Sequence, residues 1–309
     1  MVKNNTVKKK ETHIGKKQDR NFLIVMLAIP VLSWIVFWLI TNLTSFIIAF
    51  QDTTGNFSFV NFELFWDSLT ENDGYLAVSA INTLKYFAVS SFVIFPLTIC
   101  VCYFFFKQIA GYKVFRIIFY LPAIISAVVF TGVFKSMIAN NGPLGLIFSQ
   151  LGVELPQSGW LGTPDTATNT IIVYSIWTGI CGNMLLVSGA MARIPVEVLE
   201  AAKLDGAKIR HELFSLVLPL IWPTLSTILL ISMSGLLLAS GPVLLLQPLP
   251  SMKTGTISYW LFDMVYAGGS VGAGKYSLVS AAGLCFTIVL LPITLFARWL
   301  MEKVPTVEY

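Results

Sequence analysis

One polar stretch between two long apolar runs decides the organisation of this chain, and it reads Arg193-Ile-Pro-Val-Glu-Val-Leu-Glu-Ala-Ala-Lys-Leu-Asp-Gly-Ala-Lys-Ile-Arg-His-Glu-Leu-Phe-Ser-Leu-Val-Leu-Pro219. Pro195 suits the first turn of a helix, where its missing N–H costs nothing. Ala201 and Ala202 are strong helix formers. Gly206 suits the left-handed backbone position that closes a helix, and Pro219 marks the end or a kink of a second short helix. The sequence therefore predicts a helix–glycine–helix elbow over 193–221, with a small and smooth surface at the two alanines.

Apolar runs without a charged residue surround this elbow, and each is long enough to cross a membrane. They cover 21–51, 86–106, 117–134, 166–192, 213–252 and 276–297. About 18–20 apolar residues in a helix span the ~30 Å of hydrocarbon in a bilayer. Lipid offers no hydrogen bonds to the backbone, and the runs lack the alternation of a barrel strand, so helices are expected. Only 12% of the 309 residues are charged, which is too few for a soluble fold of this length. The predicted fold class is an all-α polytopic membrane protein with six transmembrane helices.

These runs divide the chain into a tail, one leading span and a core. We expect a basic cytoplasmic tail at 1–21, a first transmembrane helix at 22–50, an outer loop at 51–80, a core at 81–302 and a cytoplasmic tail at 303–309. Within the core, the predicted spans are about 81–106, 115–138, 168–192, 222–246 and 276–300. The 213–252 run could supply two helices, and we interpret it as one span that follows an amphipathic cytoplasmic piece.

The basic residues orient this topology, because lysines and arginines gather on the cytoplasmic side of membrane proteins. With six spans and both termini inside, the outer side keeps only Lys85, Lys135, Lys253 and Lys275 of the 20 lysines and arginines. The elbow then lies inside. The basic tail could suggest nucleic acid or acidic lipid. A disordered inside-positive tail is the favoured interpretation, so membrane lipid is expected as a partner and nucleic acid is not.

The middle of the spans contains neutral polar residues and no aspartate, glutamate or histidine. Ion-coupled carriers usually bury ionisable residues, so a coupling-ion mechanism and a strongly charged solute are both disfavoured. Energy for uphill transport would then enter from a partner at the cytoplasmic face. From depth and polarity the candidates for a solute path are Asn82, Trp177, Asn183 and Ser234. Helix packing is the alternative role for each, and helical spacing does not place Trp177 and Asn183 on one face.

Two features imitate other chemistries. Gly269-Ser-Val-Gly-Ala-Gly-Lys275 has the glycine and lysine spacing of a phosphate-binding loop, but Tyr276 follows where that motif needs serine or threonine. We interpret it as a glycine-rich outer loop. His13 and His211 lack the partners of a metal site, and the cysteines are expected to be packing residues. No catalytic residue and no metal site are predicted.

The elbow resembles a known motif. Glu200-Ala201-Ala202, three residues, Gly206, nine residues and then Leu216-Val217-Leu218-Pro219 resemble the EAA loop of permease subunits in binding-protein-dependent ABC importers. Asp205 and Ala207 beside Gly206 match as well, whereas the family usually has isoleucine in place of Leu216. Three further segments resemble the sugar-permease branch of this family, which includes maltose and glycerol-phosphate permease subunits. They are Tyr120-Leu121-Pro122, Asn141-Gly142-Pro143 and Gly159-Trp160-Leu161.

This resemblance implies a type I ABC importer permease fold with a cytoplasmic coupling helix between spans four and five. Glu200 would contact a separate ATPase dimer, while Ala201, Ala202 and Gly206 would permit the close fit, and Asp205, Leu216 and Pro219 complete the loop. ATP and magnesium would bind that ATPase, and this chain would hold no cofactor. The further implied partners are a second homologous permease subunit and an extracytoplasmic solute-binding protein.

The expected function is to form half of the path of an ATP-driven importer for a neutral solute, for which an oligosaccharide or other carbohydrate is favoured. The chain would be a multi-pass protein of a prokaryotic plasma membrane with both termini cytoplasmic, and not an enzyme. Two alternatives stay open. One is a permease of the same architecture for a non-sugar solute. The other is an integral membrane enzyme or a secondary carrier that needs no partner.

Overall fold

The long apolar runs form long helices in the computed structural model, which describes residues 13–52, 54–71, 74–152, 156–237, 241–266 and 273–304. Among these residues, five continuous helical stretches are long and apolar enough to cross a membrane, and a pair of segments with a sharp bend between them is a candidate for a sixth span. The predicted all-helical membrane fold is confirmed. The five stretches consist of α1 (His13–Trp34), η1 (Ile35–Ile40) and α2 (Thr41–Ala49); α4 (Tyr75–Val89), η2 (Ser90–Ile94) and α5 (Phe95–Phe106); α9 (Pro164–Met191); α11 (Ile209–His211), η3 (Glu212–Val217), α12 (Leu218–Ser234) and η4 (Gly235–Leu237); and α15 (Ala273–Glu302).

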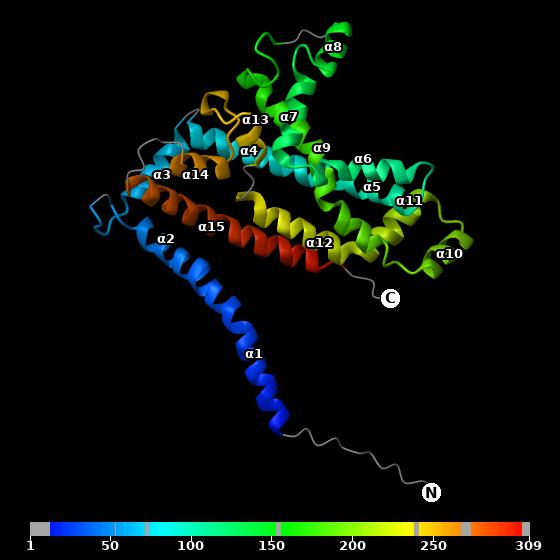
Figure 1. The fold of residues 1–309 in the computed structure, drawn as a ribbon, viewed down its shortest axis with the longest axis horizontal. Coiled ribbons are helices and arrows are strands. Elements are labelled where there is room, and N and C mark those ends of the chain that lie inside the picture. Colours follow the sequence, from blue (N-terminus) through cyan, green and yellow to red (C-terminus); the bar gives the residue numbers. More distant parts are fainter. Residues whose placement is uncertain are drawn as a thin grey trace.

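The third span differs from the single helix expected at 115–138. It consists of α6 (Tyr112–Ile124) and α7 (Ala127–Ile138), and the segments 112–124 and 127–150 form an angle of 111°. Pro122 has no N–H to donate in the last turn of α6. Ile125 and Ser126 then adopt extended backbone with ψ of 141° and 135°. Beyond α7, the short helix α8 (Pro143–Gln150) projects from the bundle (Figure 1).

The fifth span also starts and ends earlier than the expected 222–246. Its helix runs without a break from Ile209 to Leu237, and α13 (Gly241–Leu246) is a separate short helix. Pro219 does not end the helix. The π-helical segment η3 (Glu212–Val217) ends two residues before it and changes the hydrogen-bond pattern at this point. There the N–H of Leu218 bonds to the carbonyl of Leu213, five residues back. The proline, which has no N–H to donate, therefore lies where the backbone hydrogen bonds change from the i−5 pattern of η3 to the i−4 pattern of α12.

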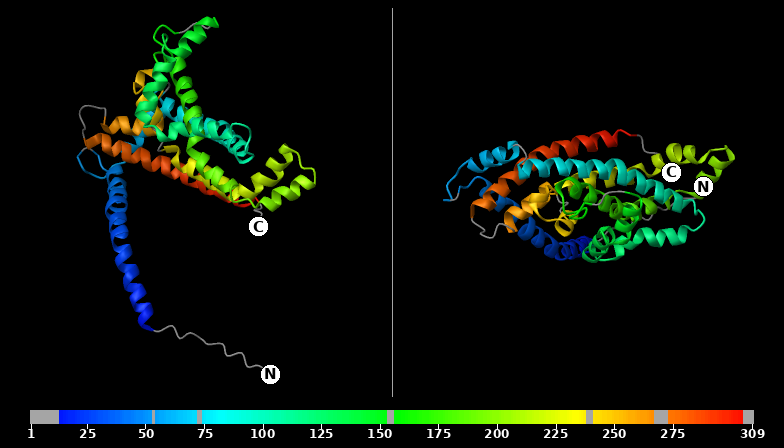
Figure 2. Two further views of the ribbon diagram at one scale, coloured as in Figure 1. Left: turned by 45° about the vertical axis from the view of Figure 1, so that its right-hand side comes forward. Right: turned by 90° about the horizontal axis from the view of Figure 1, so that it is seen from above.

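The two ends of the bundle carry different structures. The short helix α10 (Val196–Leu204) lies at one end, and α3 (Val60–Thr70) and α14 (Ile257–Tyr266) lie at the opposite end (Figures 1 and 2). Helix α3 falls within the stretch 51–80 that was expected to be a loop, and α4 begins at Tyr75 within the same stretch. The buried Asn61 side chain holds α3 in place by donating to the carbonyls of Ala49 and Gln51.

The largest buried core lies towards the α10 end, where α5, α9 and α12 pack together. Cys102, Met184, Met191 and Val217 are at most 1% exposed in this cluster. By contrast, the most apolar stretch of the first span, within 20–49, is not buried inside the chain. Helix α1 leaves the bundle and projects away from it (Figure 1). The elbow is therefore attached to the largest buried core of the described residues.

Candidate functional site

The elbow has the predicted helix–glycine–helix geometry. Pro195 occupies the N-cap position of α10 with extended backbone. At the other end Gly206 has φ of +74°, and the N–H of Ala207 donates to the carbonyl of Ala202 at 2.9 Å. A Cβ added at Gly206 would meet no atom within 4 Å. Glycine is therefore favoured here by the left-handed conformation and not by lack of space.

The elbow exposes apolar side chains next to the motif residues. Glu200, Ala201 and Asp205 are exposed, and Ala202 is half-buried. Leu204 is 89% exposed at the end of α10. Charged neighbours keep this helix out of the hydrocarbon, so lipid does not explain the exposure of Leu204. Three more apolar residues of the elbow region are more than 60% exposed, and they are Val196, Ile209 and Phe214. Exposed apolar groups rimmed by charge are typical of a surface that a partner protein covers.

The remaining motif residues point towards the bundle. Leu216 is half-buried and packs against the large core cluster, as Val198 and Leu199 of α10 also do. Pro219 is half-buried near the start of α12. The motif thus places one set of residues outwards and another set against the core.

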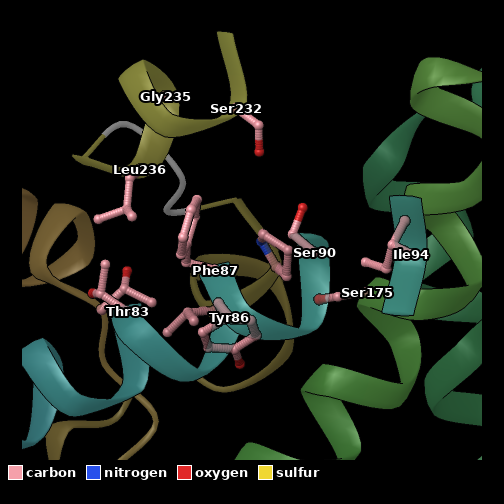
Figure 3. A pocket seen from close by; sticks show the side chains of 12 residues that line it. Thr83, Tyr86, Phe87, Ser90, Ile94, Ser175, Ser232, Gly235 and Leu236 are labelled. Carbon is pink, nitrogen blue, oxygen red and sulfur yellow. The ribbon is translucent and has the colours of Figure 1, made fainter. Parts of the chain in front are cut away.

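A separate cavity of about 190 Å³ lies among α4, α9, α12 and the segment around α13. Thr83, Tyr86, Phe87 and Ser90 of one helix line it together with Ser175 of α9 (Figure 3). Hydroxyl and apolar side chains make up its wall, and none of the twelve described lining residues is charged. Such a surface can exchange hydrogen bonds with a neutral polar solute and offers no counter-ion to a charged one.

The four residues predicted for a solute path do not line this cavity. Asn82 is buried, and its amide donates to the carbonyls of Lys253 and Gly255 at 2.7 and 3.0 Å. Trp177 lies against Phe130, with ring centroids 4.5 Å apart. Asn183 is half-buried in α9. Ser234 is exposed and donates to the carbonyl of Leu230.

Ser232 lines the cavity instead of Ser234. Two residues along a helix differ by about 200° in direction, so depth in the sequence alone could not separate these two serines. Leu204 was also missed at the elbow, because an apolar residue of a short amphipathic helix is expected to face the core. Assigning Ser232 to the cavity and Leu204 to the exposed surface requires knowing where each side chain points, which the sequence alone does not give.

Two other expectations concern absent chemistry. The glycine-rich stretch 269–275 begins outside the described residues, which resume at 273. Within the described parts of the chain, no group of three histidine, cysteine, aspartate or glutamate side chains could hold a metal ion.

Comparisons with known proteins give a consistent result. The model of a family described as "Binding-protein-dependent transport system inner membrane component" matches residues 109–305. The multiple sugar-binding transport system permease protein MsmF of Streptococcus mutans is 24% identical over 263 residues, which cover 84% of this chain and 88% of MsmF. The arabinooligosaccharides transport system permease protein AraP of Bacillus subtilis is 26% identical over 86% of this chain and 84% of AraP.

The maltose/maltodextrin transport system permease protein MalF of Escherichia coli is 27% identical, but the match spans only 37% of its length. Among solved structures, a bacterial ABC transporter involved in the import of the acidic polysaccharide alginate matches with a TM-score of 0.79. That match has 22% identity and covers 96% of this chain and all of the other. The same kind of transporter in complex with an alginate pentasaccharide-bound periplasmic protein gives a TM-score of 0.77 at 23% identity, over 91% and 94% of the two chains.

Proposed function

The chain belongs to the family of binding-protein-dependent transport system inner membrane components, and from this premise we propose that it forms half of the path of an ATP-driven carbohydrate importer. A separate ATPase supplies the energy in this proposal and docks on the elbow. The observation that carries it is the exposed elbow, whose first helix ends at the left-handed Gly206 and which is attached to the largest buried core of the described residues.

The proposed role of the elbow in coupling to the ATPase is supported by the way its residues divide between an exposed face and a face packed on the bundle. Glu200, Ala201 and Leu204 are free to contact a partner, while Leu216 packs into the bundle. A force applied to the exposed face therefore reaches α9 and α12 through packed side chains. The opposite end of the bundle, with α3 and α14, then faces outwards and receives the solute, and both termini are cytoplasmic in this arrangement.

The assignment of a carbohydrate has two supports. The names of relatives that align over most of this chain refer to sugars and arabinooligosaccharides. Independently, the cavity wall carries the hydroxyls of Ser90 and Ser232 and no charge. A neutral sugar fits this wall better than an acidic polysaccharide such as alginate, which would require cationic partners. The predicted substrate is a neutral oligosaccharide.

The size of the cavity supports a second permease subunit. About 190 Å³ is less than the roughly 300–1,000 Å³ of most small-molecule sites. A homologous subunit facing this wall would complete the path, and an extracytoplasmic binding protein would deliver the sugar. Asn82, with its two bonds to the 253–255 segment, is then proposed to hold the wall together and not to contact the solute.

Reconstitution tests this proposal. The chain is purified with the products of neighbouring permease and ATPase reading frames, placed in vesicles, and supplied with ATP and the binding protein loaded with labelled neutral oligosaccharides. We expect uptake that needs ATP and every component. Uptake by this chain alone would favour a secondary carrier, and failure of the complete set with every neutral sugar tested would refute a neutral carbohydrate as the substrate.

A further inference from the structure

A buried ion pair joins the elbow to the second span. Lys107 follows the last residue of α5, and Glu212 is the first residue of η3, just beyond the predicted coupling helix. The Lys107 ammonium donates to both carboxylate oxygens of Glu212 at 2.8 Å. The Glu212 side chain is 4% exposed and the Lys107 side chain is 26% exposed. These residues are 105 positions apart, so only the tertiary fold brings them together.

This pair is not an economical way to stabilise the fold. Burying a carboxylate removes its hydration, and a buried ion pair is often no more stable than apolar residues of the same volume. Its distinctive property is that it tethers two segments far apart in the sequence, because separating the Lys107 ammonium from both oxygens would leave the Glu212 carboxylate buried and unpaired. A role in holding geometry therefore explains the pair better than a role in stability alone.

Two grooves flank the pair, while Tyr103 and Phe105 of α5 and Val217 of η3 belong to the apolar core beside it. Glu212 lines a cavity of about 640 Å³ on the elbow side, and Lys107 lines another of about 690 Å³ between α5, α6, α9 and α10. Tyr103 of α5 adds polar contacts nearby: its hydroxyl donates to the carbonyl of Ile209 at 3.5 Å and also interacts with the Glu212 carboxylate. That longer bond is weaker than the ion pair.

The helix that Lys107 ends is continuous with the wall of the solute cavity. Helix α5 follows η2 and α4, and α4 with η2 supplies Thr83, Tyr86, Ser90 and Ile94 to the cavity. Both η2 and η3 are π-helical, a conformation that often occurs at functional positions. The helical unit 75–106 thus carries part of the cavity wall in its first half, and directly after its last residue the ion pair connects it to the elbow.

We propose that Lys107 and Glu212 are positioning residues that transmit movement of the elbow to the α4–α5 wall of the solute cavity. This inference rests on the proposed function of the chain as a transport subunit. A movement of α10 and α11 towards or away from the bundle carries Glu212 with it. Glu212 belongs to the continuous helix 209–237, which also lines the cavity at Ser232. Because the carboxylate holds the Lys107 ammonium, the end of α5 follows this helix, and both walls of the cavity shift relative to α9.

The experiment measures solute transported per ATP hydrolysed by the complete complex in vesicles. The decisive variant is the double replacement Lys107→Met with Glu212→Gln, which leaves no unpaired buried charge. Arg298 and Glu302 provide the matched control, because they form an exposed ion pair of the same 2.8 Å length on α15. The control is Arg298→Met with Glu302→Gln.

We expect the double variant to assemble with the ATPase in normal amounts and to hydrolyse ATP, but to lose at least about fivefold in solute per ATP, the lower limit of usual coupling between two sites. The control is expected to keep the wild-type ratio. Glu212→Gln alone should assemble and show the same loss. A wild-type ratio in the Lys107–Glu212 double variant would overturn the inference.

Failure of the inference can be told from failure of the proposed function. If the wild-type complex transports sugar and the double variant has the same ratio, only the positioning role is wrong. If the double variant loses transport because the complex no longer assembles, the pair is structural and the inference is again refuted. If the wild-type complex transports no sugar, the proposed function itself fails.

Discussion

Leu204, at the exposed end of α10 in the elbow, permits a prediction about partner binding that does not depend on the stability of the fold. Leu204 is 89% exposed, so the chain itself gains little from burying it. Full burial of a leucine contributes about 1.5–3 kcal/mol, and alanine would retain part of that while preserving helix propensity. If the ATPase covers this side chain, Leu204→Ala should weaken the complex by about 1–2 kcal/mol, or roughly 5- to 30-fold in Kd.

The assay is binding of the purified ATPase to the permease in nanodiscs, together with thermal unfolding of each permease variant. Leu151→Ala is the control, because Leu151 is 72% exposed at the end of α8, away from the elbow. We expect the control to bind normally and both variants to unfold as the wild type does. Equal affinity of Leu204→Ala and the wild type would refute the view that α10 is covered by the ATPase.

Three further predictions concern residues whose side chains or backbone are specified by the structure. Gly206→Ala should destabilise the elbow by about 1–2 kcal/mol because of its positive φ, and Gly206→Asn by less, since asparagine tolerates this conformation; equal loss of ATPase capture in both variants would contradict a conformational cause. Asn82→Ala should lower the free energy of unfolding in detergent by about 1–3 kcal/mol. The control Asn42→Ala removes an exposed hydrogen bond from the Asn42 amide to the carbonyl of Trp38 and should change this free energy by under about 0.5 kcal/mol. Similar losses in the two variants would count against the role of Asn82. Lys107→Met should lower the free energy of unfolding by about 3–5 kcal/mol because it leaves the buried Glu212 carboxylate without its ion-pair partner. Glu212→Gln should lower it by less, because the lysine can reach water. The reverse order in denaturation curves would show that burial does not decide the effect.

The sequence predicted the elements whose cause is local. Apolar length specified the membrane helices, and the need for a left-handed residue after Leu204 and Asp205 identified Gly206 as the end of the first elbow helix. Helix α3 was not predicted, because its apolar side is short and Asn61 is held by carbonyls of an earlier segment. The π-helical pairing before Pro219 also depends on how the whole fifth span packs.

The remaining features depend on direction in space. Hydrophobicity does not encode the 111° bend at Ile125 and Ser126. It also does not tell which of two nearby serines faces a cavity, so Ser234 was expected where Ser232 lies. The pairing of Lys107 with Glu212 joins residues that the sequence places in separate loops, and only the packing of α5 against the elbow brings their charges together.

The central claim is that the elbow lies on the cytoplasmic side and is covered there by an energy-supplying partner. Labelling of Ala201→Cys with a membrane-impermeant maleimide tests it directly, in a chain whose native Cys100, Cys102, Cys181 and Cys285 are replaced by alanine. The expected result is labelling in inside-out vesicles and not in right-side-out vesicles, with protection when the ATPase is bound. Labelling from the outer side, or equal labelling with and without the ATPase, would contradict the claim.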